Sequence, residues 1–251
     1  MSAPEVVVSQ TTSAWASDAA TRVIRCLVAA QTARGVAHVC LTGGRSGNAV
    51  MSAMAESGSI SSIDWTSVHV WWGDERFLPY GDPDRNDTAA MSLLLDRVDL
   101  PASHIHRMPA PGDQPDVDAA AQAYANALSE YAGASDPTAV PSFDLCLLGL
   151  GPDAHVASLF PQRPEVRERA HTVIAVLDSP KPPPTRITVT LPTINSSREV
   201  FLLASGADKA SAVLLTLAEH RLELAPASGV HGRSRTLLLV DLDAAGQLPQ
   251  V

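Results

Sequence analysis

Short apolar runs alternate with helix-forming segments along nearly the whole chain of 251 residues, and this alternation restricts the fold more than any other feature. The four-residue apolar repeat from Trp15 to Leu27 is typical of one face of a helix, which Gly35 would end. Strands are predicted at residues 6–8, 36–41, 67–72, 143–148, 172–177, 186–191, 199–204 and 236–240, and further helices at 48–56, 86–98, 116–131 and 207–219. Strands that alternate with helices indicate an α/β layered fold with a largely parallel sheet.

The domain organisation is predicted to be simple. We find no internal repeat and no linker long enough to separate two domains, although residues 133–142 are expected to form a polar connector. Domains usually hold roughly 100 to 200 residues, and a chain of this size buries about 70 to 75% of its unfolded surface. We therefore predict one domain over residues 1–251.

The charge balance restricts the partners. The chain has 18 Lys and Arg against 27 Asp and Glu, a formal net charge of −9. Nucleic acids and anionic membranes are bound mainly through clustered Lys and Arg, so neither is expected as a partner, and no obligatory protein partner is evident. A small anionic ligand remains compatible with this net charge. Charges are screened over about 10 Å, so a few arginines can set the local electrostatic field at a binding site.

Neither export nor membrane insertion is indicated. Residues 1–10 lack the basic and apolar regions of a secretion signal, and no apolar run approaches the roughly 18 residues of a membrane span. We therefore expect a cytoplasmic protein. The cysteines, which are odd in number and each lie in an apolar run, are predicted to be plain buried thiols: Cys26, Cys40 and Cys146.

In an α/β fold the ligand lies beyond the carboxyl ends of the strands, so the loops at these ends are expected to carry the functional residues. Residues 42–47, Thr-Gly-Gly-Arg-Ser-Gly, lie between a buried strand and a helix. Glycines allow a sharp turn that exposes backbone N–H groups beside the positive end of the helix, which suits a phosphate, and Arg45 and Ser46 would add donors. An ordinary tight turn is the alternative, and no Gly-Lys-Ser/Thr of a Walker loop follows.

Residues 149–154, Gly-Leu-Gly-Pro-Asp-Ala, formally fit a dinucleotide fingerprint, with Asp178 at a later strand end. Pro161 would end the required helix after about one and a half turns, so NAD(P) is disfavoured. His155 follows in the same loop, with Asp153 nearby. A neutral imidazole there could take a proton from water, although a hydrogen-bonded structural histidine is the alternative.

Other loops contribute charges. Asp74 and Arg76 follow a strand, where they could form a solvated loop or an internal ion pair instead of a site. The proline-rich segment 179–184 is expected to be a stiff loop that holds Arg186, and Lys209 could reach an anion or lie on a helix surface. No metal site, Cys-x-x-Cys or Gly-x-Ser-x-Gly pattern is found, so no metal or cofactor is expected and any hydrolysis would use water directly.

Taken together, these loops resemble the 6-phosphogluconolactonase family, which shares a superfamily with the glucosamine-6-phosphate isomerases. Five matching segments occur in the family's order and span nearly the whole chain: residues 41–46, 72–79 with 84–86, 143–144 through 148–161, 179–188, and Gly206 with 209–210. The resemblance implies a Rossmann-like fold with helices flanking a mainly parallel central sheet. It also implies hydrolysis of 6-phospho-D-glucono-1,5-lactone to 6-phosphogluconate, in the oxidative pentose phosphate pathway, without metal or cofactor.

The resemblance also implies roles for individual residues. His155 resembles the base that activates water, Arg76 a substrate-facing cation, and Asp153 a residue that orients the imidazole or holds a sugar hydroxyl. Candidate oxyanion donors are Arg76 and backbone N–H groups near Gly151. The implied contacts of the phosphorylated sugar lactone are Gly43, Gly44, Arg45, Ser46, Asp74, Arg186 and Lys209.

Two positions depart from the family pattern. Ala154 stands where glycine is usual, and a positive φ there would cost about 1 kcal/mol and could tilt His155. Arg85 replaces a common serine and is expected to be a mild change.

Two alternative functions fit the sequence less well than the lactonase. The isomerase/deaminase enzymes of the sister family carry a glutamate five residues after the histidine, where this chain has Phe160, so an acid–base group for ring opening is missing. A non-catalytic phosphosugar-binding module could keep the glycine loop and Lys209 while losing the base, but His155 is retained. We therefore expect the lactonase.

Overall fold

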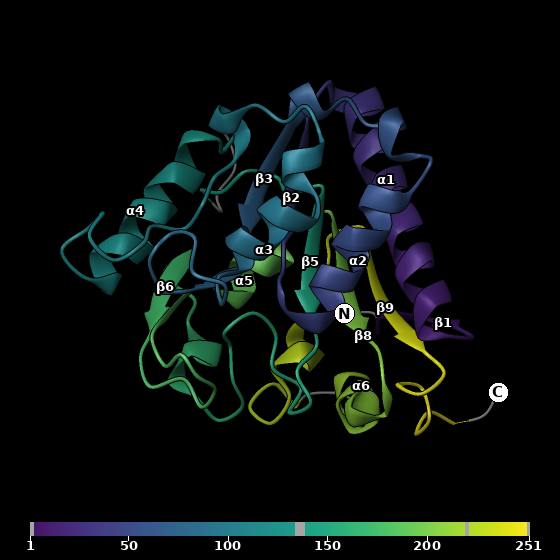
Figure 1. Ribbon diagram of the computed structural model, residues 1–251. Helices are drawn as coiled ribbons and strands as arrows, with labels where there is room; N and C mark the ends of the chain where they lie inside the picture. Colours follow the sequence, from purple (N-terminus) through teal and green to yellow (C-terminus); the bar gives the residue numbers. More distant parts are fainter. Residues whose placement is uncertain (1–2, 134–138, 219–220, 250–251) are drawn as a thin grey trace.

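A six-stranded parallel sheet forms the centre of the molecule (Figure 1). The computed structural model describes residues 3–133, 139–218 and 221–249. The strand order is β1-β9-β8-β5-β2-β3, and all neighbouring strands run parallel. The strand bounds are β1 Glu5–Ser9, β2 Ala37–Leu41, β3 Val68–Trp72, β5 Leu145–Gly149, β8 Glu199–Ala204 and β9 Arg235–Asp241. The predicted α/β fold with a mainly parallel central sheet is therefore confirmed.

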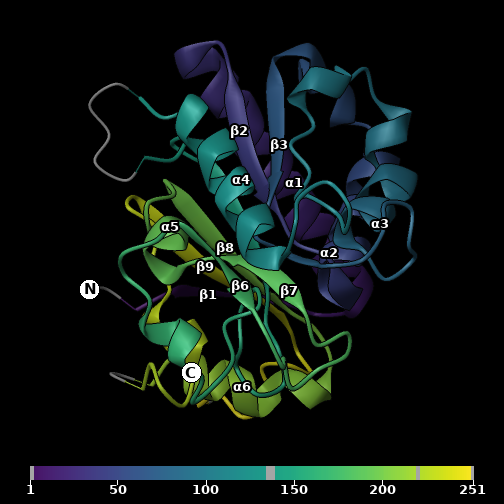
Figure 2. The same ribbon diagram turned by 90° about the vertical axis from the view of Figure 1, so that its left-hand side faces the viewer.

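Helices and a second sheet cover the central sheet (Figure 2). Helices α1 and α2 pack against each other and against the central strands, and α3 continues this layer. Helix α4 lies on two strands of the second sheet, β6 (Val173–Val176) and β7 (Arg186–Val189). The hydroxyl of Tyr124 in this helix forms hydrogen bonds with the backbone of Trp72 in β3. The helix bounds are α1 Thr12–Arg34, α2 Gly44–Glu56, α3 Asn86–Leu93, α4 Val117–Glu130, α5 Leu191–Asn195 and α6 Ala210–Thr216.

Local signals explain where the long helices begin and end. Helix α1 begins after Thr11, whose side chain accepts a hydrogen bond from Ala14 N, and it ends at Gly35, which adopts φ +76°. Helix α4 begins after Asp116, whose carboxylate accepts from Ala119 N at 2.8 Å. Such caps pair backbone groups that the first and last turns leave without a helical partner.

A second, antiparallel sheet was not expected from the sequence. Its order is β4-β7-β6, with bounds β4 Asp74–Arg76, β6 Val173–Val176 and β7 Arg186–Val189. The strands predicted at residues 172–177 and 186–191 do exist, but they pair with each other because the chain between them is too short for a parallel crossover. The polar segment that begins at Gly73 contains β4, which pairs with β7 so that Arg76 lies opposite Arg186.

Several element boundaries also differ from the prediction. Helix α2 begins four residues earlier than expected, at Gly44, so the glycine loop is the first turn of the helix. Helix α3 ends at Leu93, and a separate 3-10 turn, Leu95–Arg97, follows it. Leu191 opens α5 instead of closing a strand. Residue 219 of the predicted last helix and residues 134–138 of the predicted connector lie outside the described residues.

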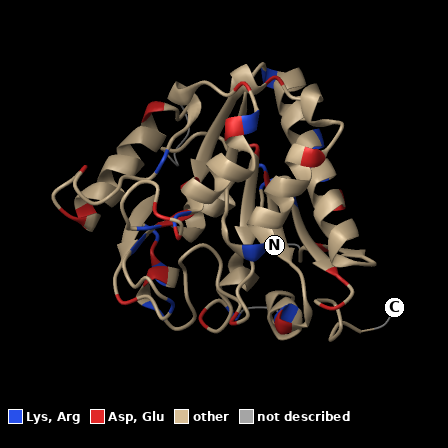
Figure 3. Ribbon diagram, in the orientation of Figure 1, with Lys and Arg blue, Asp and Glu red and all other residues tan. Residues whose placement is uncertain are grey.

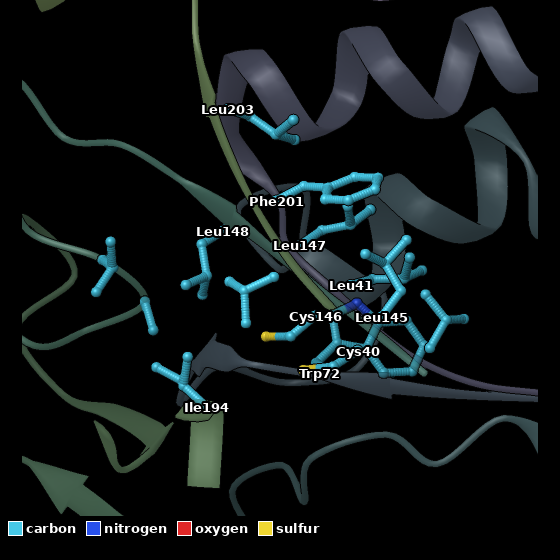
Figure 4. Packing of buried hydrophobic residues seen from close by; sticks show 14 of the residues in the cluster. Cys40, Leu41, Trp72, Leu145, Cys146, Leu147, Leu148, Ile194, Phe201 and Leu203 are labelled. Atoms are coloured by element: carbon cyan, nitrogen blue, oxygen red, sulfur yellow. The ribbon is translucent and has the colours of Figure 1, made fainter. Parts of the chain in front are cut away.

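The buried core lies on both faces of the central sheet (Figure 4). Cys40 and Cys146 are fully buried free thiols on neighbouring strands, directly paired in register between β2 and β5. Cys26 is a free thiol too, but it is only partly buried, and burial raises its pKa to about 12. The expectation of plain thiols therefore holds, with full burial confirmed for two of the three.

Charged residues of both signs are interspersed over the molecule (Figure 3). Within residues 3–133, 139–218 and 221–249, no helix has the length and apolar character needed to cross a membrane. The same ranges contain no group of three or more His, Cys, Asp or Glu side chains arranged to hold a metal ion.

Four histidines form a stacked cluster at the amino-terminal ends of β2 and β3. The His69 ring stacks on His104 with centroids 4.0 Å apart, and the His106 ring stacks on Trp71 at 3.7 Å. His69 Nδ1 lies 2.9 Å from His106 Nε2, and His38 stacks on His69. Burial, together with the neighbouring imidazoles, lowers the pKa of His38, His69 and His106 to about 4 each.

This cluster predicts a loss of stability in mild acid. Unfolded histidines titrate near 6.5, so the unfolded chain binds more protons than the folded one between about pH 6.5 and 4, and the free energy of unfolding falls through this window as the pH is lowered. His106→Phe keeps a stacking ring and removes one titrating group. Over this pH window, the free energy of unfolding of the variant should therefore fall by about 1 kcal/mol less than that of wild type. This is below the roughly 1.4 kcal/mol per unit of pKa difference that an unscreened group would give, because solvent screens the partly exposed imidazole.

Urea unfolding at a series of pH values between 7 and 4 measures this effect. His171→Phe is the control, because His171 is exposed and lies outside the cluster. Equal pH profiles for His106→Phe and wild type would contradict the prediction.

Candidate active site

The loops that follow β2, β5 and β8 meet at one pocket of about 250 Å³, beyond the carboxyl ends of the strands. The strand order reverses here, since β2 leads outward to β3 while β5 returns to the other side of β2. Ligands of α/β sheets bind at such a point. The pocket brings together nearly all residues singled out in the sequence: Gly43, Gly44, Arg45, Ser46, Asp74, Arg76, His155, Arg186 and Lys209. Asp153 is outside the lining but contacts His155.

A larger cavity of about 540 Å³ lies elsewhere, beside α5 and α6. Its lining is mainly apolar, and it contains none of the residues predicted to form the site. The smaller polar pocket, where charged groups converge, is therefore the candidate active site.

The loop requires glycine at positions 43 and 44 for two different geometric reasons. Gly44 adopts φ +70°, which favours glycine at the start of α2. Gly43 has an ordinary negative φ, but a Cβ there would lie 2.0 Å from Asn86 Oδ1. The loop therefore packs directly on Asn86, and the first turn of α2, with its unpaired N–H groups, lines the pocket.

Arg45 and Lys209 lie at the rim of the pocket, where both are close to Asp208. Arg45 Nη2 donates to Ser205 O at 2.9 Å and to Asp208 Oδ1 at 2.7 Å, although 62% of its side chain is exposed. Lys209 Nζ lies 4.0 Å from Asp208 Oδ2 and is only 13% exposed. Burial, with added repulsion from Arg45 and Lys181, lowers the pKa of Lys209. An anion bound here would relieve that repulsion.

His155 is held beside a carboxylate. Its Nδ1 lies 2.5 Å from Asp153 Oδ1, and its side chain is 14% exposed. Burial lowers the pKa of His155, and the hydrogen bond and charge of Asp153 oppose this only in part. The pKa of Asp153 lies well below its usual range, because the hydrogen bond from His155 and the charges of His155 and Lys181 outweigh burial. A neutral imidazole that donates through Nδ1 leaves Nε2 as a proton acceptor.

The backbone around this pair is tightly fitted. A Cβ at Gly151 would lie 2.0 Å from His155 Nδ1, so only glycine fits beneath the ring. Ala154 adopts φ +62°, and the suspected positive φ at this departure from the family pattern is confirmed. The Phe160 ring lies 4.6 Å from the His155 ring, centroid to centroid, and is fully buried.

The second sheet supplies the opposite wall of the pocket. Asp74 accepts a hydrogen bond from Ser158 Oγ at 2.7 Å. Asn86 Nδ2 donates to Asp74 O at 2.8 Å, and Asn86 Oδ1 accepts from the Arg76 guanidinium. Asn86 thus joins the glycine loop, β4 and Arg76, which makes it a central positioning group of the wall.

Arg186 is almost fully buried and is bonded to the proline-rich loop that precedes it. Its guanidinium donates to the carbonyls of Lys181, Pro182 and Pro183 at 3.0 to 3.1 Å. Its Nη1 also lies 3.5 Å from Ser158 Oγ and 3.9 Å from Asp74 Oδ2. These bonds confirm the prediction that the proline-rich loop holds Arg186, and they fix the loop in turn.

A buried ionic network supports this wall from behind. Glu75 accepts hydrogen bonds from the backbone N–H groups of Asn86 and Asp87 at 2.8 and 2.9 Å. Arg85 donates to Asp87 and to the carbonyls of Leu78 and Met108. Burial raises the pKa of Glu75 to about 7, and the charge of Arg85 opposes this rise. Arg85, expected to be a mild change, is fully buried and holds this network together.

The sequence reasoning missed two residues of the pocket. The motif at residues 84–86 contains Asn86 but indicates no role for it, and the proline-rich loop that contains Lys181 predicts stiffness without a charge beside His155. Lys181 Nζ lies 3.2 Å from His155 Nδ1 and 3.4 Å from Asp153 Oδ1. The signal that could have found Lys181 is its position as one of two lysines in the chain, the other being Lys209.

The chain is similar to known proteins over most of its length. Residues 10–239 match the family model described as glucosamine-6-phosphate isomerases/6-phosphogluconolactonase. The chain belongs to this family. A 6-phosphogluconolactonase of Streptomyces coelicolor is 52% identical over 98% of this chain and 95% of its own length. One of Mycobacterium tuberculosis is 47% identical over 91% of this chain and 92% of its own.

Solved structures of the family share the fold. A 6-phosphogluconolactonase from Trypanosoma brucei superposes with a TM-score of 0.83 at 26% identity, covering 98% of each chain. A monomeric glucosamine-6-phosphate deaminase matches with a TM-score of 0.77 at 21% identity, covering 96% of this chain and 99% of its own, which supports the fold alone. The sequence-based assignment to the family, and with it to an enzyme, is confirmed.

The packing of the glycine loop on Asn86 predicts a coupled effect on stability. Gly43→Ala forces Asn86 to move, and such overpacking should lower the free energy of unfolding by about 1 to 3 kcal/mol. Most of this loss should disappear in an Asn86→Ala background, where the clashing amide is absent. Urea unfolding of the two single variants and the double variant measures the coupling.

Gly58→Ala is the matched control, because a Cβ at Gly58 meets nothing within 4 Å and its φ is not positive. An equal loss for Gly43→Ala with and without Asn86 would show that the close contact is not the cause.

Proposed function

We propose that this protein hydrolyses 6-phospho-D-glucono-1,5-lactone to 6-phospho-D-gluconate, a step of the oxidative pentose phosphate pathway. One observation carries the proposal: His155, oriented by Asp153, faces the same 250 Å³ pocket as Lys209 and the glycine loop. A base and an anion site in one pocket suit a phosphorylated ester. The names of the curated relatives, among them the enzyme of Streptomyces coelicolor, support the same substrate.

In the first half of the reaction, a water oxygen attacks the lactone carbonyl carbon while His155 Nε2 takes a proton from that water. The carbonyl oxygen becomes a tetrahedral oxyanion, and the imidazole becomes an imidazolium beside Asp153. In the second half, the bond from this carbon to the ring oxygen breaks, and the imidazolium returns the proton to the leaving oxygen. A positioned base of this kind typically contributes 10²- to 10⁴-fold to the rate.

Arg76 is the candidate donor to the oxyanion. Asn86 holds its guanidinium at the pocket wall, and a preorganised donor is worth about 10²- to 10³-fold. The N–H of Gly151, considered from the sequence as another donor, already donates to His155 O at 2.9 Å. This leaves Arg76 as the stronger candidate.

The phosphate would bind at the start of α2. Gly43, Gly44 and the side chain of Ser46 line the pocket at the positive end of this helix. Arg45 and Lys209 add two cations at the rim. A phosphate of charge near −2 would neutralise their mutual repulsion.

The rival functions fit less well. An isomerase or deaminase needs a further acid–base group for ring opening, and the ring beside His155 is the buried, apolar Phe160. A non-catalytic phosphosugar-binding module would not need a histidine paired with a carboxylate. Both alternatives predict no hydrolysis of the lactone above the spontaneous rate.

The first test is hydrolysis itself. Freshly made 6-phosphogluconolactone is mixed with the purified protein, and 6-phosphogluconate is measured with a coupled 6-phosphogluconate dehydrogenase against the spontaneous rate. Wild type should accelerate hydrolysis, and His155→Ala should reduce kcat by about 10²- to 10⁴-fold because the base is lost. His171→Ala, which removes an exposed histidine outside the pocket, is the control. A wild-type rate equal to background, or release of ammonia from glucosamine 6-phosphate instead, would refute the assignment.

The second test concerns the phosphate. Lys209→Ala and Arg45→Ala should mainly raise KM, because each removes a cation from the rim. The effect should be larger for Lys209, since Arg45 is exposed and already paired with Asp208. Arg22→Ala, on the surface of α1 and paired with Asp18, is the matched control and should leave KM unchanged. Unchanged KM in both pocket variants would move the phosphate site elsewhere.

A further inference from the structure

Lys181 contacts the very pair of groups that would activate water. Its Nζ lies 3.4 Å from Asp153 Oδ1 and 3.2 Å from His155 Nδ1, and its side chain is 37% exposed toward the pocket. Its backbone is fixed, because Lys181 O accepts from Arg186 Nη2 and from Ser179 Oγ, each at 3.0 Å. The ammonium group therefore extends on a long, half-exposed side chain from a backbone held by hydrogen bonds.

The donors and acceptors of these side chains show that the contacts of Lys181 with Asp153 and His155 compete. The distance of 2.5 Å between His155 Nδ1 and Asp153 Oδ1 requires the proton on Nδ1, because two acceptors would repel each other. A protonated Nδ1 cannot accept a bond from Lys181. The ammonium and the imidazole therefore share one carboxylate oxygen, and the ammonium stands close to the ring without bonding it.

We propose that Lys181 is a positioning residue that shares Asp153 with His155 until substrate binds and then turns to the anionic sugar phosphate, which leaves the carboxylate to the imidazolium formed during water attack. This inference rests on the proposed lactonase function. The imidazole of His155 would then accept a proton most strongly only when an anion occupies the anion site.

The electrostatics of the pocket agree with this geometry. Burial is the main cause of the lowered pKa of His155, and the charge of Lys181 adds to it, whereas Asp153 and the more distant Asp74 act in the opposite direction. Lys181 also contributes to the lowered pKa of Lys209. The same ammonium thus acts on both the base and the anion site, and an anion bound beside Lys209 would attract it away from His155.

The decisive variant is Lys181→Met, which keeps a long side chain and removes the charge. In the ligand-free protein, the pKa of His155, followed by NMR of its imidazole nitrogens, should rise by about one unit, because a nearby positive charge is removed. If the lactonase assignment holds, the acid limb of the pH profile of kcat/KM should move to higher pH by the same amount. Lys181→Arg should restore the wild-type profile, since it restores the charge.

Binding of 6-phosphogluconate tests the coupling directly. The product should raise the pKa of His155 more in wild type than in Lys181→Met, because only wild type has an ammonium to withdraw. Lys209→Met is the matched control: it removes a cation that is not among the charges acting on the pKa of His155, so KM should rise while the acid limb stays in place.

The outcomes separate this inference from the proposed function. If His155 titrates identically in ligand-free wild type and Lys181→Met, or if 6-phosphogluconate shifts it equally in both, the role of Lys181 is overturned even when hydrolysis is fast. If the ligand-free titration shifts as expected but wild type does not hydrolyse the lactone, the contact is real and the proposed function is wrong.

Discussion

The parallel pairing of β5 between β2 and β8 is the constraint on which the site depends. This register places the loops after the three strands at the same edge of the sheet, and Gly149 N bonds Thr42 Oγ1 across two of them at 3.3 Å. Segments more than 100 residues apart in the chain thereby meet. The pairing itself is stabilised by burial, since Cys40 and Cys146 lie opposite each other in the fully buried core.

Behind the pocket, polar groups are buried at a cost in stability that apolar packing would avoid. Replacing one partner of a buried charged pair is strongly destabilising, and the pair itself is weak evidence for stability. The network of Glu75, Arg85 and Asp87 instead fixes the position of Asn86, and Asn86 fixes Arg76. We interpret the network as the support that keeps the pocket wall rigid before a ligand arrives.

Most elements could be predicted from the sequence because each carries its own local signal: the apolar periodicity of α1, its glycine end and the apolar runs of the central strands. The antiparallel sheet could not, because β4 has only three polar residues, Asp74–Arg76, and is defined by its partner. At the site, motif residues such as His155 were identified, whereas Lys181 was missed because its contacts with Asp153 and His155 join positions 28 and 26 residues apart.

The α/β class, the order of the loops and the kinds of chemistry they carry follow from the sequence alone, since periodicity and motifs a few residues long specify them. Which side chains meet depends on the tertiary structure. The fold places Asn86 between the glycine loop and Arg76, and it brings Lys181 to the base. Such contacts join distant segments through the sheet register, and no local pattern records them.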